Sequence, residues 1–213
     1  MTSPSRRFST AAIVGLLLVA LTVTLIVFLQ LRLRAGPPLP KIAQVVNFTL
    51  TNQFGSAVSL ADLRGEVWVA DIIFTRCPGP CARMTRQMKE LETALPRGSG
   101  TRLVSLTTDP DFDSPEILRQ YAERFGADSN RWMFLTGSKT EIARAAIDGL
   151  KLTAIEKAPE ERESVDDLFI HSTIFVVVDR HGVLRGVFET GDVEWSVSKQ
   201  RLLDAVRKLE RER

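Results

Sequence analysis

The chain has 213 residues, of which 44% are hydrophobic and 25% are charged. This length is enough for one domain with a sizeable hydrophobic core and one additional segment. The formal net charge is only +2, and the 28 Lys and Arg residues are scattered among 26 acidic ones, which argues against a nucleic-acid-binding protein.

The first predicted element is a membrane anchor over Ala11–Leu31, preceded by a short tail of residues 1–10. The run contains no charged residue, and as a helix it would span about 31 Å, which matches the hydrocarbon core of a bilayer. A cleaved signal peptide would have a shorter apolar region and a small-residue cleavage site. We therefore interpret the run as an uncleaved transmembrane helix.

The expected location of the remaining chain follows from this anchor. Arginines flank both ends of the run, so the positive-inside rule barely decides the orientation. The short tail is easiest to leave in the cytoplasm, which places residues 36–213 outside. We expect a single-pass protein of a bacterial inner membrane whose soluble domain faces the periplasm.

The predicted linker, residues 32–42, contains the stiff, extended sequence Gly36-Pro-Pro-Leu-Pro40. The predicted domain, residues 43–213, begins with a β-hairpin formed by Phe48–Leu50 and Val58–Leu60.

Val67–Phe74 is the next predicted strand, and its nearly continuous apolar sequence is typical of a strand buried on both faces. Asp71 interrupts the apolar run. A carboxylate in such a strand requires a partner or a shifted pKa.

The only two cysteines follow this strand, in the stretch Phe74-Thr-Arg-Cys-Pro-Gly-Pro-Cys-Ala-Arg-Met84. Cys81 begins an apolar stripe with the 3, 4, 3, 4 spacing of one helix face. The stripe continues through Met84, Met88, Leu91 and Leu95. It predicts a helix with Pro80 in its first turn and Cys77 in the preceding loop. Because N–H groups at a helix start stabilise anions, we expect either thiol to be biased toward the thiolate.

A disulfide and a metal site are both compatible with this cysteine spacing. If Cys77 were nearly helical, its Cα atom would lie about 6 Å from that of Cys81. That distance allows a disulfide, and it equally allows two thiolates to bind one soft metal ion. The alternative is that both cysteines merely pack in the core, as we expect for Met84 and Met88.

The remaining predicted elements alternate between helix and strand. They are a strand at Leu103–Thr107, helices over 115–126 and 138–149, strands at Ser172–Asp179 and Val183–Glu189, and a final helix with Leu202, Leu203, Val206 and Leu209 inward. This alternation predicts a three-layer α/β domain. The order β-α-β-α-β-β-α, with the cysteines after the first central strand, is that of a thioredoxin-like fold.

Three acids, Asp109, Asp111 and Asp113, alternate like the start of a calcium-binding loop. Ser114 and Gln120 occupy the positions where such a loop requires glycine and glutamate, so we reject an EF-hand. A turn at the end of a strand, followed by a helix start, accounts for these acids. A role of Asp109 in tuning the cysteine site is the alternative.

The two histidines lie in different contexts. His181 is in the predicted turn between the last two strands, where contact with solvent explains it. His171 follows the polar segment Glu156–Asp167, which we expect to be a mobile loop, and it immediately precedes a strand. From that position it could face the start of the cysteine-containing helix. The alternative is an ordinary hydrogen-bonded histidine.

Several short motifs occur in a specific order along the chain. They are Phe74-Thr-Arg-Cys-Pro-Gly-Pro-Cys81, Thr108-Asp-Pro110, Ser114-Pro-Glu-Ile-Leu118 with Tyr121, Leu135-Thr-Gly137, and His171-Ser172 ahead of Val178-Asp-Arg-His-Gly182. Together they resemble the Sco (SenC) family over about residues 43–210. The resemblance implies a thioredoxin-like fold and copper delivery to the binuclear copper centre of cytochrome c oxidase.

By this match Cys77, Cys81 and His171 would be the copper ligands. Two positions depart from the family pattern: Ala82 replaces the proline that usually follows the second cysteine, and residues 166–170 lack a tyrosine often found before the histidine. Two thiolates select soft ions, and an imidazole completes a three-coordinate Cu(I) site or contributes to a Cu(II) site.

With the predicted anchor, the resemblance therefore implies a membrane-anchored metallochaperone that binds copper, as Cu(I) or Cu(II), and delivers it to, or maintains the thiols of, the binuclear centre. The expected partners are the copper-bearing subunit of the oxidase or another copper chaperone. Outside the reducing cytosol the cysteine pair can also form a disulfide. The thiol redox state would then be a switch on copper loading.

The alternative function is a membrane-tethered thiol–disulfide oxidoreductase in which Cys77 and Cys81 are the redox-active pair. Thioredoxin-type enzymes normally have two residues between their cysteines, whereas this pair has three, and such enzymes do not need His171. A peroxidase of this fold would use one activated cysteine with a dedicated Thr and Arg. Thr75 and Arg76 are present, but the second cysteine is better explained by a pair.

Overall fold

The computed structural model describes residues 10–34, 37–77, 79–96, 98–162, 168–191 and 195–212. The chain divides into two compact units, Met1–Pro38 and Leu39–Arg213.

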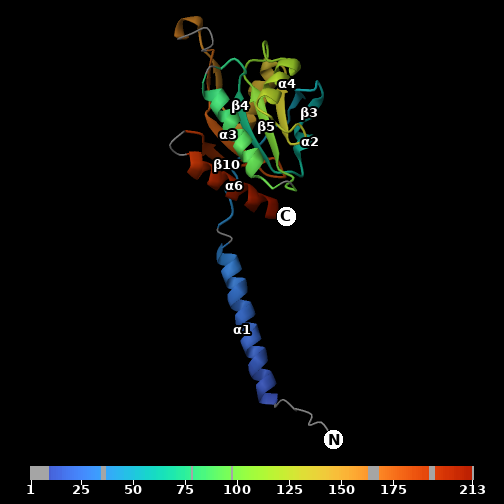
Figure 1. Cartoon of the computed structure of the whole chain (residues 1–213), viewed down its shortest axis with the longest axis vertical. Helices are drawn as coiled ribbons and strands as arrows, with labels where there is room; N and C mark the ends of the chain where they lie inside the picture. Colours follow the sequence, from blue (N-terminus) through green and yellow to red (C-terminus); the bar gives the residue numbers. More distant parts are fainter. Residues whose placement is uncertain are drawn as a thin grey trace. The chain divides into compact units, whose positions relative to one another are not determined.

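The first unit contains the helix α1, Thr10–Arg34, which confirms a helix at the predicted anchor (Figure 1). In the described part of the chain, however, no helix is both long and apolar enough to cross a membrane. The membrane-spanning role predicted for Ala11–Leu31 is therefore not supported by the structure.

The second unit is built on an eight-stranded sheet with the order β1-β10-β9-β4-β5-β6-β2-β3. Its strands are β1 Ala43–Gln44, β2 Thr49–Asn52, β3 Ala57–Ser59, β4 Trp68–Ile73, β5 Arg102–Thr107, β6 Trp132–Thr136, β9 Ile174–Val178 and β10 Val183–Glu189. The central strands β4, β5 and β6 are parallel to one another, and β9 runs antiparallel to β4. A separate two-stranded sheet pairs β7, Ala154–Glu156, with β8, Phe169–His171.

Helices cover both faces of the large sheet. They are α2 Leu60–Leu63, α3 Pro80–Ala94, α4 Pro115–Arg124, α5 Lys139–Ala143 continued by a π-helix over Arg144–Leu150, and α6 Trp195–Arg211. Buried residues of α3, α4 and α6 form one core cluster, and those of α2, α5 and the π-helix form the other. Figure 1 shows α3 against the central strands with α6 beside it. This arrangement confirms the predicted three-layer α/β domain.

Strand β4 lies at the centre because both of its faces are apolar. Val69 and Ile73 point into the cluster that contains α3, whereas Ala70 and Ile72 point into the opposite cluster. Every residue of β4 is buried, including Asp71, whose side chain is 0% exposed. The continuous apolar pattern predicted this strand correctly, because a strand covered on both faces has no polar side.

Strand β6 and part of one expected loop differ from the prediction. Strand β6 is a run of only five residues, Trp-Met-Phe-Leu-Thr, whose pairing with β5 and β2 is set by tertiary contacts. The segment Glu156–Asp167 was expected to be a loop, but it contains a 3-10 turn at Pro159–Glu161 and its first residue belongs to β7. Residues 163–167 of that segment lie outside the described part of the chain.

Arg185 fixes the start of the second unit. Its side chain is 4% exposed, and it donates to the carbonyl oxygens of Leu39 and Pro40 at 2.8 and 3.0 Å. It also donates to the carboxylates of Asp179 and Glu212 at 2.7 and 2.9 Å. One buried guanidinium therefore joins the first residues of the second unit, the β9–β10 turn and the end of α6.

We expect Arg185→Met to lower the free energy of unfolding at pH 7 by about 3 kcal/mol, because the mutation leaves the buried Asp179 carboxylate uncompensated. Burial alone raises the pKa of Asp179, but hydrogen bonds from Arg185 and from two backbone N–H groups hold that pKa below its ordinary value. Stability from this pair is therefore present above the ordinary Asp pKa of about 3.9 and is lost as pH falls through the folded-state value.

Urea unfolding of the full chain at pH 7 and at pH 3 measures this effect, and the difference between wild type and Arg185→Met should narrow at pH 3. Arg207→Met is the matched control. It removes an exposed ion pair with Asp204, whose side chain is 61% exposed, and should cost less than about 0.5 kcal/mol. Equal losses for the two arginine variants would contradict the role assigned to Arg185.

Candidate metal centre

The two cysteines lie where β4 ends and α3 begins. The Phe74 N–H donates to Cys81 Sγ at 3.4 Å, and the Cys81 N–H donates to Cys77 Sγ at 3.4 Å. The Cys77 N–H in turn donates to the Phe74 carbonyl at 3.2 Å. These three contacts fold the connection into a tight loop that brings both sulfur atoms to the start of α3. No disulfide joins them in the structure.

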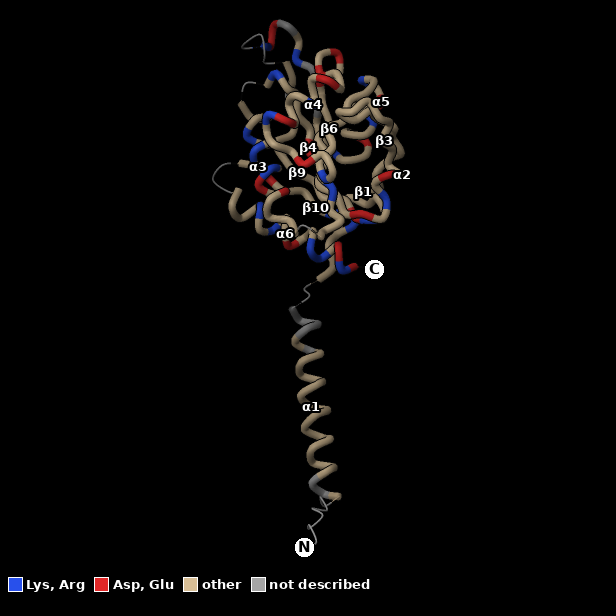
Figure 2. Tube along the Cα trace, turned by 45° about the vertical axis from the view of Figure 1, so that its right-hand side comes forward, with Lys and Arg blue, Asp and Glu red and all other residues tan. Residues whose placement is uncertain are grey.

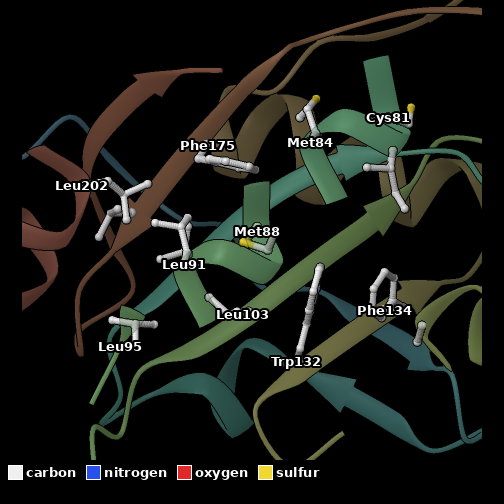
Figure 3. Packing of buried hydrophobic residues seen from close by; sticks show 14 of the residues in the cluster. Cys81, Met84, Met88, Leu91, Leu95, Leu103, Trp132, Phe134, Phe175 and Leu202 are labelled. Carbon is white, nitrogen blue, oxygen red and sulfur yellow. The ribbon is translucent and has the colours of Figure 1, made fainter. Parts of the chain in front are cut away.

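The helix α3 places Cys81 in the core, as its sequence stripe predicted. Cys81, Met84, Met88 and Leu91 are 0% exposed and Leu95 is 4% exposed, and Figure 3 shows them along one side of the helix above Leu103 and Trp132. Pro80 occupies the first turn, also as predicted. Met84 and Met88 are thus core residues.

The predicted bias of the thiols toward thiolate is wrong for Cys81. Burial is the largest cause of a raised pKa at Cys81, and the neighbouring Cys77 side chain adds to it. Asp71, which lies on the same face of β4 as the residues packed on α3, raises it further. The hydrogen bond from the Phe74 N–H acts in the opposite direction but is weaker. The helix start stabilises an anion by a modest amount, which does not offset the loss of water around a fully buried sulfur.

A small polar network beside Cys81 was not predicted. The Thr85 hydroxyl donates to the Cys81 carbonyl oxygen at 2.9 Å and lies 2.9 Å from the Tyr121 hydroxyl. Burial raises the pKa of Tyr121, and Cys81 and Asp71 contribute in the same direction. The phenol therefore stays neutral. The sequence predicted that Asp71 requires a partner or a shifted pKa. Asp71 is buried and contributes to the raised pKa of both Cys81 and Tyr121.

The three acids after β5 contact the cysteine loop rather than a calcium ion. Asp113 accepts hydrogen bonds from Thr75, and Asp109 pairs with Arg76 at 2.5 Å. Asp111 is exposed and pairs with Lys139. Ser114, next to Asp113, caps α4 by accepting from a backbone N–H. The turn and helix start predicted from the sequence are both present, and Asp109 does touch the residue that precedes Cys77.

The structure places the backbone of His171 in β8, whereas its side chain lies outside the described residues. The ring of Phe169, two residues earlier in β8, packs edge-on against Phe74 with centroids 5.2 Å apart. Phe74 also holds Cys81. The strand that contains His171 is therefore beside the cysteine loop.

His181 lies at the other end of the sheet. It belongs to the turn after β9, whose last residue, Val178, pairs with Trp68 at the start of β4. It is exposed and lines a surface pocket with Arg64 and Arg180. The six residues of β4 separate this turn from the cysteine loop by about 20 Å.

The donor set suits a soft metal ion. Cys77 is half-buried at the loop and Cys81 is fully buried beneath it, so two sulfur atoms meet with one of them near solvent. Thiolate ligands select Cu(I) or Zn over hard cations. Among the side chains that the structure describes, no group of three His, Cys, Asp or Glu residues converges on one point.

The SCO1/SenC family pattern matches residues 38–208. The SCO1 protein homolog of Bacillus subtilis (strain 168) is 39% identical over 141 residues, which are 65% of this chain and 70% of that protein.

Solved structures of the same family have the same fold. A SCO1/SenC family lipoprotein from Bacillus anthracis is 28% identical with a TM-score of 0.66, and the match covers 78% of this chain and 94% of that chain. BsSco, described as a cytochrome c oxidase assembly protein with a disulfide switch, is 31% identical with a TM-score of 0.66 over 83% and 99% of the two chains. Copper-bound ScoI from Bradyrhizobium japonicum, at 23% identity, has a TM-score of 0.61 over 75% and 99%. The predicted thioredoxin-like fold is thereby confirmed.

The burial difference predicts unequal reactivity of the two thiols. Iodoacetamide at pH 8 should modify Cys77 at least about tenfold faster than Cys81, because a buried thiol with a raised pKa presents little thiolate to the reagent. Peptide mass spectrometry of the reduced protein over time measures both rates. Cys77→Ser should leave only the slow reaction, and Cys81→Ser only the fast one. Equal rates at both cysteines would show that the buried position of Cys81 is wrong.

Proposed function

Because this chain belongs to the SCO1/SenC family, we propose that it binds copper at Cys77, Cys81 and His171 and delivers it during assembly of the binuclear copper centre of cytochrome c oxidase. Members of the family are copper-binding proteins of cytochrome c oxidase assembly. The proposal extends that role to this chain and assigns the ligands. Copper is the cargo of the protein rather than a resident cofactor.

One observation carries the proposal: both sulfur atoms lie at a single helix start, with the Cys81 N–H directed at Cys77 Sγ at 3.4 Å. Two thiolates supply softness and negative charge, which are what Cu(I) requires. The half-buried Cys77 gives an incoming partner access, while the buried Cys81 anchors the ion. The contact of Phe169 with Phe74 supports His171 as the third ligand, since it brings β8 beside the loop.

The same pair supports the redox half of the proposal. Two cysteine thiols on one loop can be oxidised to a disulfide by an acceptor of two electrons and two protons. The oxidised pair has no thiolate to offer to copper, so only the reduced protein would load. A protein that instead uses this pair to reduce the thiols of its target would be an oxidoreductase, which is the second candidate function.

Copper titration of single variants tests the ligand assignment. Cys77→Ser and Cys81→Ser should each lose Cu(I) binding by at least about a hundredfold, because each removes a thiolate ligand. His171→Ala should weaken Cu(II) more than Cu(I), since two thiolates still hold Cu(I). The titrations use the reduced full chain with a competing chelator, and absorption and electron paramagnetic resonance spectra report the ligands.

His181→Ala is the matched control, because it removes the only other histidine, about 20 Å from the loop. It should bind both ions like the wild type. Loss of binding in His181→Ala with full binding in His171→Ala would overturn the ligand assignment. Wild-type copper binding in all four variants, together with dithiol exchange that persists in the two histidine variants and is lost in the two cysteine variants, would favour the oxidoreductase.

We also propose that the protein is anchored in a bacterial inner membrane with residues 36–213 in the periplasm. The support is the uncharged sequence of residues 11–31, and the part of α1 that Figure 2 draws in colour contains no acidic or basic residue. In the second unit the same figure shows Lys and Arg interspersed with Asp and Glu along the chain.

Fractionation tests the anchor. After a carbonate wash the full-length chain should stay with the membranes, because an apolar helix is not released when ionic contacts are broken. A version that begins at Leu39 is the control and should be recovered in the soluble fraction. Recovery of a soluble mature form that starts near Gly36 would mean that residues 11–31 are a cleaved signal peptide.

A further inference from the structure

The loop before Cys77 is tied to the end of β5 by the carboxylate of Asp113. This carboxylate accepts the Thr75 N–H at 3.1 Å, the Thr75 hydroxyl, and the Thr107 hydroxyl at 2.5 Å. Asp113 and Thr107 are both 0% exposed. Thr75 is two residues before Cys77, whereas Thr107 is the last residue of β5. The carboxylate is thus a buried bridge between the strand and the cysteine loop.

A second set of contacts holds the next residue of the loop. Arg76 donates through Nε and Nη2 to Asp109 at 3.1 and 2.5 Å, and its guanidinium lies 4.2 Å from the centre of the Phe112 ring. Asp109 is itself held, because its N–H donates to the Thr107 hydroxyl at 3.0 Å and its carbonyl accepts the Asp113 N–H at 2.8 Å. Thr75 and Arg76, the two residues immediately before Cys77, are therefore both hydrogen-bonded to acidic residues of the segment 107–113.

Burying an ionised carboxylate is unfavourable unless hydrogen-bond donors surround it. Here Thr75 of the loop and Thr107 of the strand supply the donors. The free energy cost of burying the Asp113 carboxylate is therefore fully offset only while Thr75 stays in place. The arrangement is far more specific than a turn requires, since Ser114 alone caps α4. Burial also raises the pKa of Asp113, although hydrogen bonds from Thr107 and Thr75 oppose that shift.

We propose that Asp113 is a positioning residue for the cysteine pair: by holding Thr75, it keeps Cys77 within reach of Cys81. The inference rests on the proposed function in that it takes Cys77 and Cys81 to act as a pair. Asp113 touches neither sulfur in the contacts described. It acts through the backbone and hydroxyl of Thr75.

Disulfide formation measures how close the two sulfurs are held. Oxidation of the pair by oxidised glutathione forms the Cys77–Cys81 bond, breaks the glutathione disulfide and yields two reduced glutathione molecules, which take up the two electrons and two protons. The equilibrium constant of this exchange rises with the effective concentration of one thiol at the other. A loop that no longer holds Cys77 close to Cys81 should lower this equilibrium constant.

The experiment uses the full chain in a mild detergent, equilibrated with glutathione buffers, trapped by alkylation and weighed by mass spectrometry. Asp113→Ala should lower the equilibrium constant for disulfide formation about tenfold, because hydrogen bonds to a charged group are lost. Asp113→Asn, which keeps one acceptor oxygen, should recover part of the loss. Thr75→Val, which removes one hydroxyl with little change of shape, should lower the constant about threefold.

Asp179→Asn is the matched control. Asp179 is also buried and also accepts backbone N–H groups and a side-chain donor, but it lies at the opposite end of the sheet. It should reduce resistance to urea and leave the glutathione equilibrium of the folded protein unchanged. That contrast separates positioning of the thiols from general stability.

A tenfold loss in Asp113→Ala with an unchanged Asp179→Asn supports the proposal. Equal constants for Asp113→Ala and wild type overturn it, as does an equal loss in Asp179→Asn. If Asp113→Ala does not fold, Thr75→Val decides: a folded Thr75→Val with the wild-type constant overturns the proposal. Copper titration of the wild type is a separate measurement. A wild type that binds no copper would refute the proposed function and leave the comparison of disulfide constants valid.

Discussion

The site depends on the position of α3 relative to β4. A hydrogen bond from the Phe74 N–H to the sulfur of Cys81 fixes that position. Because β4 is covered on both faces, its position in the sheet cannot shift without exposing apolar side chains on one face or the other. Its last residues are therefore rigidly placed. The apolar stripe that begins at Cys81 then packs α3 against the core on that face of the sheet. The loop between these two elements has little freedom, and Cys77 lies in it.

The same geometry gives the two cysteines different environments. Cys81 shares the core with Met88 and Leu91 and behaves as a small hydrophobic residue with a raised pKa. Cys77 lies at the boundary between that core and solvent. A soft cation offers what the buried sulfur lacks, namely a charge that compensates a thiolate without water. A Cys81 thiolate is therefore unfavourable in this position unless a cation is bound to it, which couples deprotonation of this thiol to metal binding.

Much of this fold is local enough to be predicted from sequence. The helix α3 has a long apolar period and Pro80 at its start, and β4 has an unbroken apolar run. Strand β6 carries no such signal, because its pairing between β5 and β2 depends on elements far away in the chain. The contacts of Asp113 also join distant segments, so the sequence suggested a helix start but not a bridge to Thr75. The thiolate bias was wrong for the same reason: a helix start is visible in the sequence, whereas full burial of Cys81 is a tertiary property.

The buried Arg185 has a mechanical consequence. It donates hydrogen bonds to the carbonyl oxygens of Leu39 and Pro40 and joins them to the end of α6 and the β9–β10 turn. The strand that follows, β1, pairs with β10 at the edge of the sheet. A pulling force on the chain ahead of Leu39 would load these contacts first. They lie at the end of the sheet away from the cysteine loop, so tension would peel the edge strand before it strained α3. The geometry of the two thiols would therefore change little under such a force.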